Sequence, residues 1–201
     1  MDRTAFLRLL SKRLFPHLRD DGFAGSGTTL RRLNGAVLHV FNVQGSANTE
    51  NFFVNLGATL LPLATGSETQ ASAIKEYQCI FRERLHPPEL PRQNWAYGET
   101  EDDAEEVAAR LHEAYRSRGR TWFDDHGGAP DSLRRLVDDP TALTLHPAHL
   151  LSLARVAEQL GDAERCRTLA SEGLKRTPER ATGLAADLRQ LLDRVGRPVR
   201  D

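Results

Sequence analysis

The chain has 201 residues, of which 39% are hydrophobic and 27% are charged. This length suits one large domain or a small domain with an appendage, and the composition is that of a globular protein. The 27 basic and 28 acidic residues nearly cancel, which gives a formal net charge of -1. A chain so close to neutral has no overall field that would draw it to nucleic acid or to a membrane surface.

Cys79 and Cys166 are the two cysteines, and both lie in apolar segments. Neither belongs to a Cys-x-x-Cys pair, so we expect free, buried thiols, with no disulfide framework and no zinc site. Residues 1–18 are interrupted by charges, unlike a signal peptide, and no stretch approaches the roughly 20 apolar residues that span a bilayer. The sequence therefore predicts a soluble, cytoplasmic protein without a membrane partner.

The first predicted element is a helix over residues 3–19, in which apolar residues recur at helical spacing behind the capping residue Asp2. Two strands follow over residues 28–33 and 36–44. Between them, Asn34-Gly35 is a strong two-residue hairpin turn, because both residues tolerate a positive φ. This part of the chain predicts an antiparallel hairpin next to a helix.

Residues 51–61 and 76–85 predict two further strands, so the expected sheet has about four strands. Thr100 precedes three acidic residues and caps a predicted helix that runs to about Ser117. Trp122-Phe123 is expected to pack as a short apolar plug. In the fourth strand, four alternate residues are expected on one side: Tyr77, Cys79, Phe81 and Leu85.

Beyond the Gly127-Gly128 pair the period-two pattern ends, and every periodic segment is helical. We therefore predict an α+β fold, with an N-terminal helix packed on an antiparallel sheet, followed by an all-helical C-terminal part. The expected division is 1–128 and 129–201. The predicted C-terminal helices are 131–138, 147–160, 163–176 and 180–194.

The order of short motifs in the first part resembles the bacterial domain-of-unknown-function family numbered 4304, over about residues 4–126. One departure is Trp95, which is followed by alanine where the family pattern suggests a bulkier aromatic pair. The resemblance implies the fold and the order of elements, and it brings no activity with it. The motifs are Gly22-Phe23, Arg31-Arg32, residues 41–46, residues 52–57, residues 80–85, Trp95 and residues 122–124.

A second, local resemblance is to one tetratricopeptide-repeat unit, over the predicted helices 147–160 and 163–176. One such unit cannot bury its own apolar face, and arrays usually need about three repeats. The alternatives are therefore an ordinary helical hairpin and a short repeat-like groove for a partner peptide. The residues that carry the resemblance are Leu150, Leu153, Ala154, Ala157, Gly161, Asp162, Cys166, Ala170, Gly173, Leu174 and Pro178.

A search for chemistry finds no catalytic set, no cofactor motif and no metal site. His146 and His149 are three residues apart, but Pro147 between them marks a helix start, which is not the spacing of a helical metal pair. His39 lies in a strand and fits a hydrogen-bonded core histidine. The paired acids border helix ends and loops, where capping and solvation explain them.

One group of polar residues suggests a binding face. Strand alternation places Arg82 and Arg84 on one side of their strand, about 7 Å apart. Asn42 and Gln44 share a side of a second strand, and Asn55 lies in a third. If these sides coincide, guanidiniums and amides converge at one end of a sheet face. The alternative is a solvated face on which the arginines pair with loop acids such as Glu68 or Glu99.

These observations favour a binding or interaction protein that recognises an acidic partner protein or a small anionic ligand through the face just described. Small α+β proteins that neutralise bacterial toxins offer an analogy, which suggests an immunity-like role. The alternative is an enzyme acting on a small anionic substrate, although no catalytic residues identify it. Nucleic-acid binding would rest on basic residues of the first helix, and the near-zero net charge argues against it.

Overall fold

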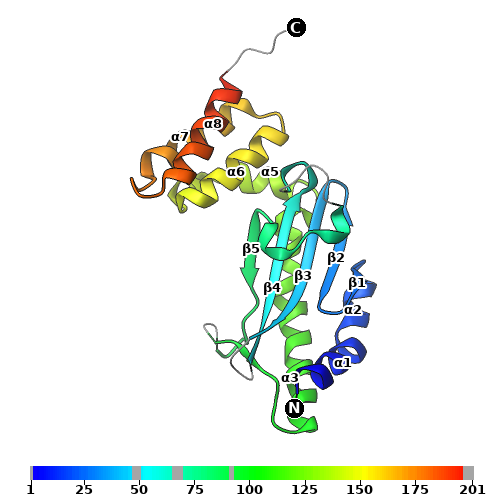
Figure 1. Cartoon of the computed structure of the whole chain (residues 1–201). Helices are drawn as coiled ribbons and strands as arrows, with labels where there is room; N and C mark the ends of the chain where they lie inside the picture. The colour runs from blue at the N-terminus through cyan, green and yellow to red at the C-terminus, as the bar shows by residue number, and fades with distance from the viewer. Residues whose placement is uncertain (1, 47–50, 65–69, 91–92, 197–201) are drawn as a thin grey trace. The chain divides into compact units, whose positions relative to one another are not determined.

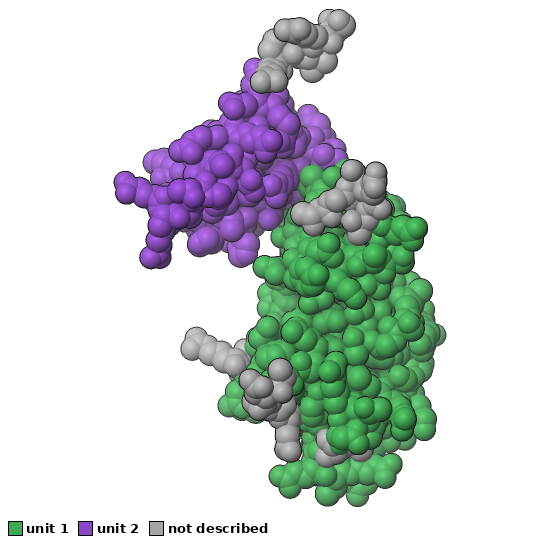
Figure 2. Space-filling view, in the orientation of Figure 1, with its two compact units in different colours: residues 1–128 green, residues 129–201 purple. Residues whose placement is uncertain are grey.

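The computed structural model describes residues 2–46, 51–64, 70–90 and 93–196. Figure 1 traces an N-terminal helical segment, an antiparallel sheet and a run of C-terminal helices, so the expected α+β fold class is confirmed. The chain divides into two compact units, residues 1–128 and 129–201, which Figure 2 colours separately. The sheet and the candidate site belong to the first unit.

The first unit contains one antiparallel sheet, in which the strands follow the order β1-β2-β3-β4-β5 and β6 pairs with the start of β4. The hairpin between β2 and β3 is present, but its two-residue turn is Gly35-Ala36, one residue later than predicted. Asn34 ends β2 and pairs with Val37, and Gly35 supplies the positive φ, 58°. The sheet has two short strands more than expected. The strands are β1 (Ala24–Ser26), β2 (Thr29–Asn34), β3 (Val37–Gly45), β4 (Asn51–Leu60), β5 (Phe81–Arg84) and β6 (Trp95–Ala96).

The predicted first helix is two helices, α1 (Arg3–Arg13) and α2 (Phe15–Asp20). Asp2 caps α1 as expected, since its Oδ1 accepts from the Ala5 N–H at 2.8 Å. The prediction of one continuous helix was wrong because Pro16 has no N–H to donate to the preceding turn. The chain therefore restarts at α2 after a break at Leu14.

The second helical segment begins at Thr100, which forms the predicted cap: its hydroxyl accepts from the Asp103 N–H at 3.1 Å. The helix α3 (Glu101–Ala114) passes through a wider turn at Tyr115–Gly119 and continues as α4 (Arg120–Phe123). The expected end near Ser117 was therefore too early. Trp122 and Phe123 lie within this helical segment, and they pack into the core of the first unit as expected, with Phe123 fully buried.

The two faces of the sheet have different environments. One face, here called the helical face, packs against the helices of the first unit, with Phe41 and Leu56 in the same buried core as Phe6 and Leu111. The opposite face, here called the outer face, carries a smaller apolar cluster at one end, where Leu38, Val40, Ile74 and Cys79 are buried together. The described residues of the segment between β4 and β5 cover that end.

The prediction of a strand over residues 76–85 was partly wrong. Glu76–Gln78 form a single 3-10 turn, Tyr77 is 65% exposed, and the strand begins at Phe81. The Cys79 side chain instead packs against the outer face, where Gly57 leaves room for it. The alternating apolar residues are typical of one strand, although only Phe81–Arg84 pair with β4.

Replacing Gly57 with alanine is expected to expose the Cys79 thiol. An added Cβ would lie 2.8 Å from the Cys79 Sγ, so the covering segment must shift. Burial raises the pKa of Cys79 to about 12, which keeps the thiol unreactive in the native protein. We expect iodoacetamide to label Cys79 at least tenfold faster in Gly57→Ala. Mass spectrometry resolves the two cysteines, so the buried Cys166 serves as the internal reference.

The matched control is Gly183→Ala, since the added Cβ at that position meets nothing within 4 Å beyond the adjacent backbone of its own helix. This variant should leave both labelling rates unchanged. Equal, slow labelling of Cys79 in Gly57→Ala and in the unaltered protein would show that the glycine does not hold the cover in place.

All regular secondary structure among the described residues of the second unit is helical, as predicted. Gly173 allows close packing, because a Cβ there would lie 3.3 Å from Leu150 Cβ and 3.2 Å from Leu188 Cδ2. The hairpin is thus present, while its assignment to the tetratricopeptide repeat stays a prediction. Within the described ranges, no helix has both the length and the apolar character needed to cross a membrane. The helices are α5 (Ser132–Asp138), α6 (Pro147–Gln159), α7 (Ala163–Arg176) and α8 (Thr182–Val195).

Candidate functional site

All five residues expected to form a binding face share the outer face of the sheet. Asn42 of β3 is opposite Asn55 of β4, and Asn55 is opposite Arg84 of β5. Directly opposed residues share a face, as do residues two apart in one strand, so Gln44 and Arg82 lie there as well. The register therefore brings together the guanidiniums and amides that the sequence placed on separate strands.

The three amides form a hydrogen-bonded row across β3 and β4. The Asn55 Nδ2 donates to Asn42 Oδ1 at 3.2 Å and to Gln44 Oε1 at 3.1 Å. Asn42 is buried, and its Nδ2 donates to Thr29 Oγ1 at 2.9 Å. These bonds fix the amide orientations. They engage the acceptor of Gln44 and the donor of Asn55, so a ligand would meet the Gln44 donor and the Asn55 acceptor.

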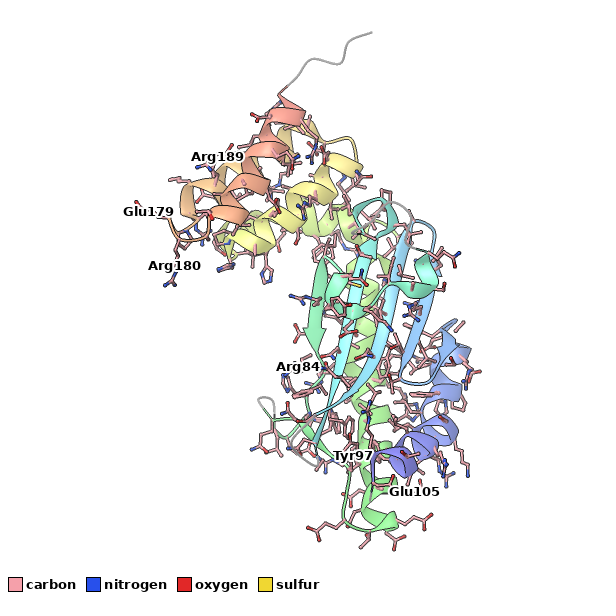
Figure 3. The ribbon with its side chains drawn as sticks, viewed as in Figure 1. Arg84, Tyr97, Glu105, Glu179, Arg180 and Arg189 are labelled. Atoms are coloured by element: carbon pink, nitrogen blue, oxygen red, sulfur yellow. The ribbon has the colours of Figure 1, made fainter. Side chains whose placement is uncertain are left out.

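The two arginines are exposed at the edge of the same face, where Figure 3 labels Arg84. The Arg84 guanidinium carbon lies 4.2 Å from the centre of the Phe53 ring, a cation–π contact that restrains the side chain. Among the ion pairs between described residues, none involves Arg82 or Arg84. Glu83 is on the helical face, and Glu68 lies outside the described residues.

A hollow of about 460 Å³ lies beside β6 and α3, in a region that no sequence motif indicated. Asn51, Asn94, Trp95 and Arg110 are among the residues that line it. The Arg110 Nε is buried without a hydrogen-bond partner among the described residues, while its terminal nitrogen pairs with Glu89. Irregular loop residues supply much of the lining, and such residues carry no periodic signal.

His39 is a structural histidine, as its place in a strand suggested. Its side chain is 0% exposed, its Nε2 donates to the His126 carbonyl at 3.1 Å, and its Nδ1 accepts from Arg32 Nε at 3.3 Å. Burial lowers the pKa of His39 to about 4, so the ring is neutral at neutral pH. The ring lies on the helical face, away from the arginines and amides.

A polar cluster on the helical side joins α2 to the second helical segment. Asp21 accepts from the Tyr115 hydroxyl at 2.6 Å and from Arg120 Nε at 2.7 Å. Burial acts to raise the pKa of Asp21, but the bonds from Arg120 and Tyr115 outweigh it and keep the pKa below its ordinary value. The pKa of Tyr115 is raised, mainly by burial and to a smaller extent by the hydrogen bond to Asp21. These groups hold one another, which is a structural role.

In the part of the chain that the structure describes, no three His, Cys, Asp or Glu side chains lie close enough together to bind a metal ion. His146 Nδ1 accepts from the Ala148 N–H at 3.2 Å, so this histidine caps α6. The groups that could receive a ligand are thus the arginines and amides of the outer face and the hollow beside Arg110.

Comparison with known proteins identifies the first unit. No curated protein and no solved structure matches the chain. The family described as Domain of unknown function (DUF4304) matches residues 14–125, which is more than half of the chain and agrees with the resemblance seen in its motifs. Within the match, Trp95 is buried and its Nε1 donates to the Leu85 carbonyl at 2.7 Å. The chain therefore belongs to the DUF4304 family, whose domain contains the whole of the Arg and amide face.

Proposed function

We propose that this protein is a binding protein and that the uncovered end of the outer face recognises a partner bearing carboxylates. The observation that carries the proposal is the placement of Arg82 and Arg84 beside a hydrogen-bonded amide row, with no acid from the described residues paired to them. The other end of the same face is apolar and already covered.

The residue types support binding to carboxylates. Arginine offers a planar fork of N–H donors that matches a carboxylate in a bidentate, charge-assisted pair. The amide row adds one donor and one acceptor whose orientation is fixed by the bonds of Asn55. Because Arg84 is restrained on Phe53, less side-chain freedom is lost when a ligand binds.

The same residues favour recognition over catalysis. A nucleophile needs an activating base, and proton transfer needs a group that titrates near neutral pH. The five residues of this face are guanidiniums and amides, which neither attack nor transfer protons at neutral pH. Of the titratable groups with strongly shifted pKa values in the first unit, His39 and Tyr115 lie on the helical side and are held by structural bonds. The Cys79 thiol is on the outer face, but it is buried in the covered apolar cluster and its pKa is raised.

Charge reversal of the two arginines tests the proposal. We expect Arg82→Glu with Arg84→Glu to weaken binding of fluorescently labelled poly-L-glutamate about 30-fold or more, equivalent to about 2 kcal/mol for losing two charge-assisted contacts. Fluorescence anisotropy at low and moderate salt measures the affinity. A melt checks first that the variant is folded.

The matched control is Arg8→Glu with Lys12→Glu on α1, two exposed residues whose reversal changes the net charge equally. This control should change the affinity by less than threefold at moderate salt. If both double variants lose affinity equally, the binding follows total charge and the face is not a site.

A further inference from the structure

β5 is the last strand on one side of the sheet, and its outer edge is the feature from which we argue. It has four residues, of which Arg82, Glu83 and Arg84 are exposed. The Leu85 N–H donates to the Val54 carbonyl at 2.9 Å, so the main-chain groups of Leu85 point toward β4, as do those of every second residue before it in the strand. Since main-chain groups alternate in direction along an antiparallel strand, those of Arg82 and Arg84 point away from β4.

The same two residues thus present main-chain groups in the plane of the sheet and guanidiniums on its outer face. We propose that β5 accepts an additional antiparallel strand, supplied by an extended acidic segment of a partner protein. Main-chain hydrogen bonds from Arg82 and Arg84 would hold that segment, and its carboxylates would lie opposite the two guanidiniums. The inference rests on the proposed function and specifies the form of the partner.

The charges along β5 predict the partner's sequence pattern. Arg82 and Arg84 share one face and Glu83 points to the other, so the strand alternates positive, negative, positive. Opposite charges directly across an antiparallel pair are stabilising, and like charges are destabilising. The complementary segment therefore has acids at positions i and i+2, with a basic residue between them.

The same rule argues against a second copy of this chain as the occupant. In a symmetric antiparallel pair of β5 strands centred on Glu83, Arg82 of one copy would face Arg84 of the other, and the two glutamates would face each other. Each of these contacts sets like charges together. The charge pattern of the edge favours an acidic strand and opposes self-association.

A synthetic nine-residue peptide with a central Glu-Lys-Glu, flanked by threonine and valine, tests the inference on the full chain. In the proposed pairing, both glutamate N–H groups point at β5 and the lysine N–H points away. We expect N-methylation of the two glutamates to weaken binding at least tenfold. N-methylation of the lysine, the matched control, should change the affinity by less than threefold.

Amide hydrogen exchange gives a second readout. Exchange at the Arg82 and Arg84 N–H groups should slow at least tenfold on saturation with the peptide, while exchange at Glu83, which already bonds to β4, should be unchanged. A peptide with the reversed pattern, Lys-Glu-Lys, should not bind.

The outcomes separate the two proposals. If charge reversal of the arginines weakens peptide binding but glutamate N-methylation does not, the carboxylate site stands and strand addition is wrong. If the two methylated peptides weaken equally, the antiparallel pairing is wrong. If the peptide does not bind while poly-L-glutamate does, strand addition alone is wrong. If the peptide binds equally well to the charge-reversed variant, both proposals are overturned.

Discussion

Acidification from pH 7 to pH 5 is expected to lower the free energy of unfolding of the first unit by about 2 kcal/mol through His39 alone. The folded protein keeps this ring neutral, with a pKa of about 4 against an ordinary value of 6.5. Between these values the unfolded chain binds a proton that the folded chain does not, so stability falls as the pH falls. Burial also lowers the pKa of His126, which adds a loss of the same sign.

Urea unfolding followed by tryptophan fluorescence measures this effect, because both tryptophans, Trp95 and Trp122, lie in the first unit. The matched variant is His39→Gln, whose side chain can donate to the His126 carbonyl but does not titrate. It should be less stable at pH 7 and should lose most of the dependence on pH. An unchanged slope in this variant would show that another group controls the acid response.

Truncating Phe123 to alanine is expected to cost about 4 kcal/mol of stability, typical of removing a fully buried aromatic ring. The ring is 0% exposed, and its centroid lies 5.1 Å from the ring of Phe23 and 4.9 Å from that of His39. It anchors the last helical turn of the family domain on the sheet. Because the ring also keeps water from His39, its loss should raise the pKa of His39 toward the ordinary value.

The alanine variant should therefore show two changes at once: lower stability at pH 7 and a weaker loss of stability between pH 7 and pH 5. The matched control is Phe123→Leu, which refills most of the space and should cost about 1.5 kcal/mol. Urea unfolding at pH 7 and pH 5 measures, for each of the two variants, the stability at pH 7 and the loss of stability on acidification. If alanine and leucine cost the same, the ring is not part of a tightly packed core.

Local turn and cap chemistry predicted much of the fold. The Asn34-Gly35 dipeptide located the β2–β3 hairpin to within one residue, because Gly35 adopts the positive φ that a two-residue turn requires while Asn34 ends β2. Thr100 and Asp2 marked helix starts, because their side chains satisfy main-chain N–H groups that the first turn leaves free. These signals are local, and a single sequence contains all the information they need.

Predictions that depended on tertiary contacts were less accurate. The alternation through Tyr77 and Cys79 is typical of a strand. In the structure, residues 76–78 form a 3-10 turn instead, and the Cys79 side chain packs against Gly57 on the outer face. The extension of α3 into α4 was missed because its last residues are stabilised by packing with Phe23 and His39, which are distant in sequence.

The sequence predicts which residues of the candidate face share a side of each strand, but it does not predict the register in which the strands pair. Alternation paired Arg82 with Arg84 and Asn42 with Gln44, but the strand pairing that brings them to one face depends on β4. The Asp21 cluster was beyond prediction, because its partners are Tyr115 and Arg120, from a distant helical segment. No local pattern distinguishes such a carboxylate from an ordinary helix-end acid.

Asn34 also determines where the chain leaves the family domain. Its Nδ2 donates to the carbonyls of Gly127 and Gly128, both at 2.9 Å, so the exit is tied to the β2–β3 turn. Gln44 lies at the other end of β3, about 24 Å away along the strand. A tag, dye or foreign domain joined after Gly128 would therefore start far from Gln44 but close to Arg82, because the ring of the preceding residue, Phe81, lies 5.1 Å from that of His126. A dye at this junction is therefore placed to report on ligands that reach the arginines.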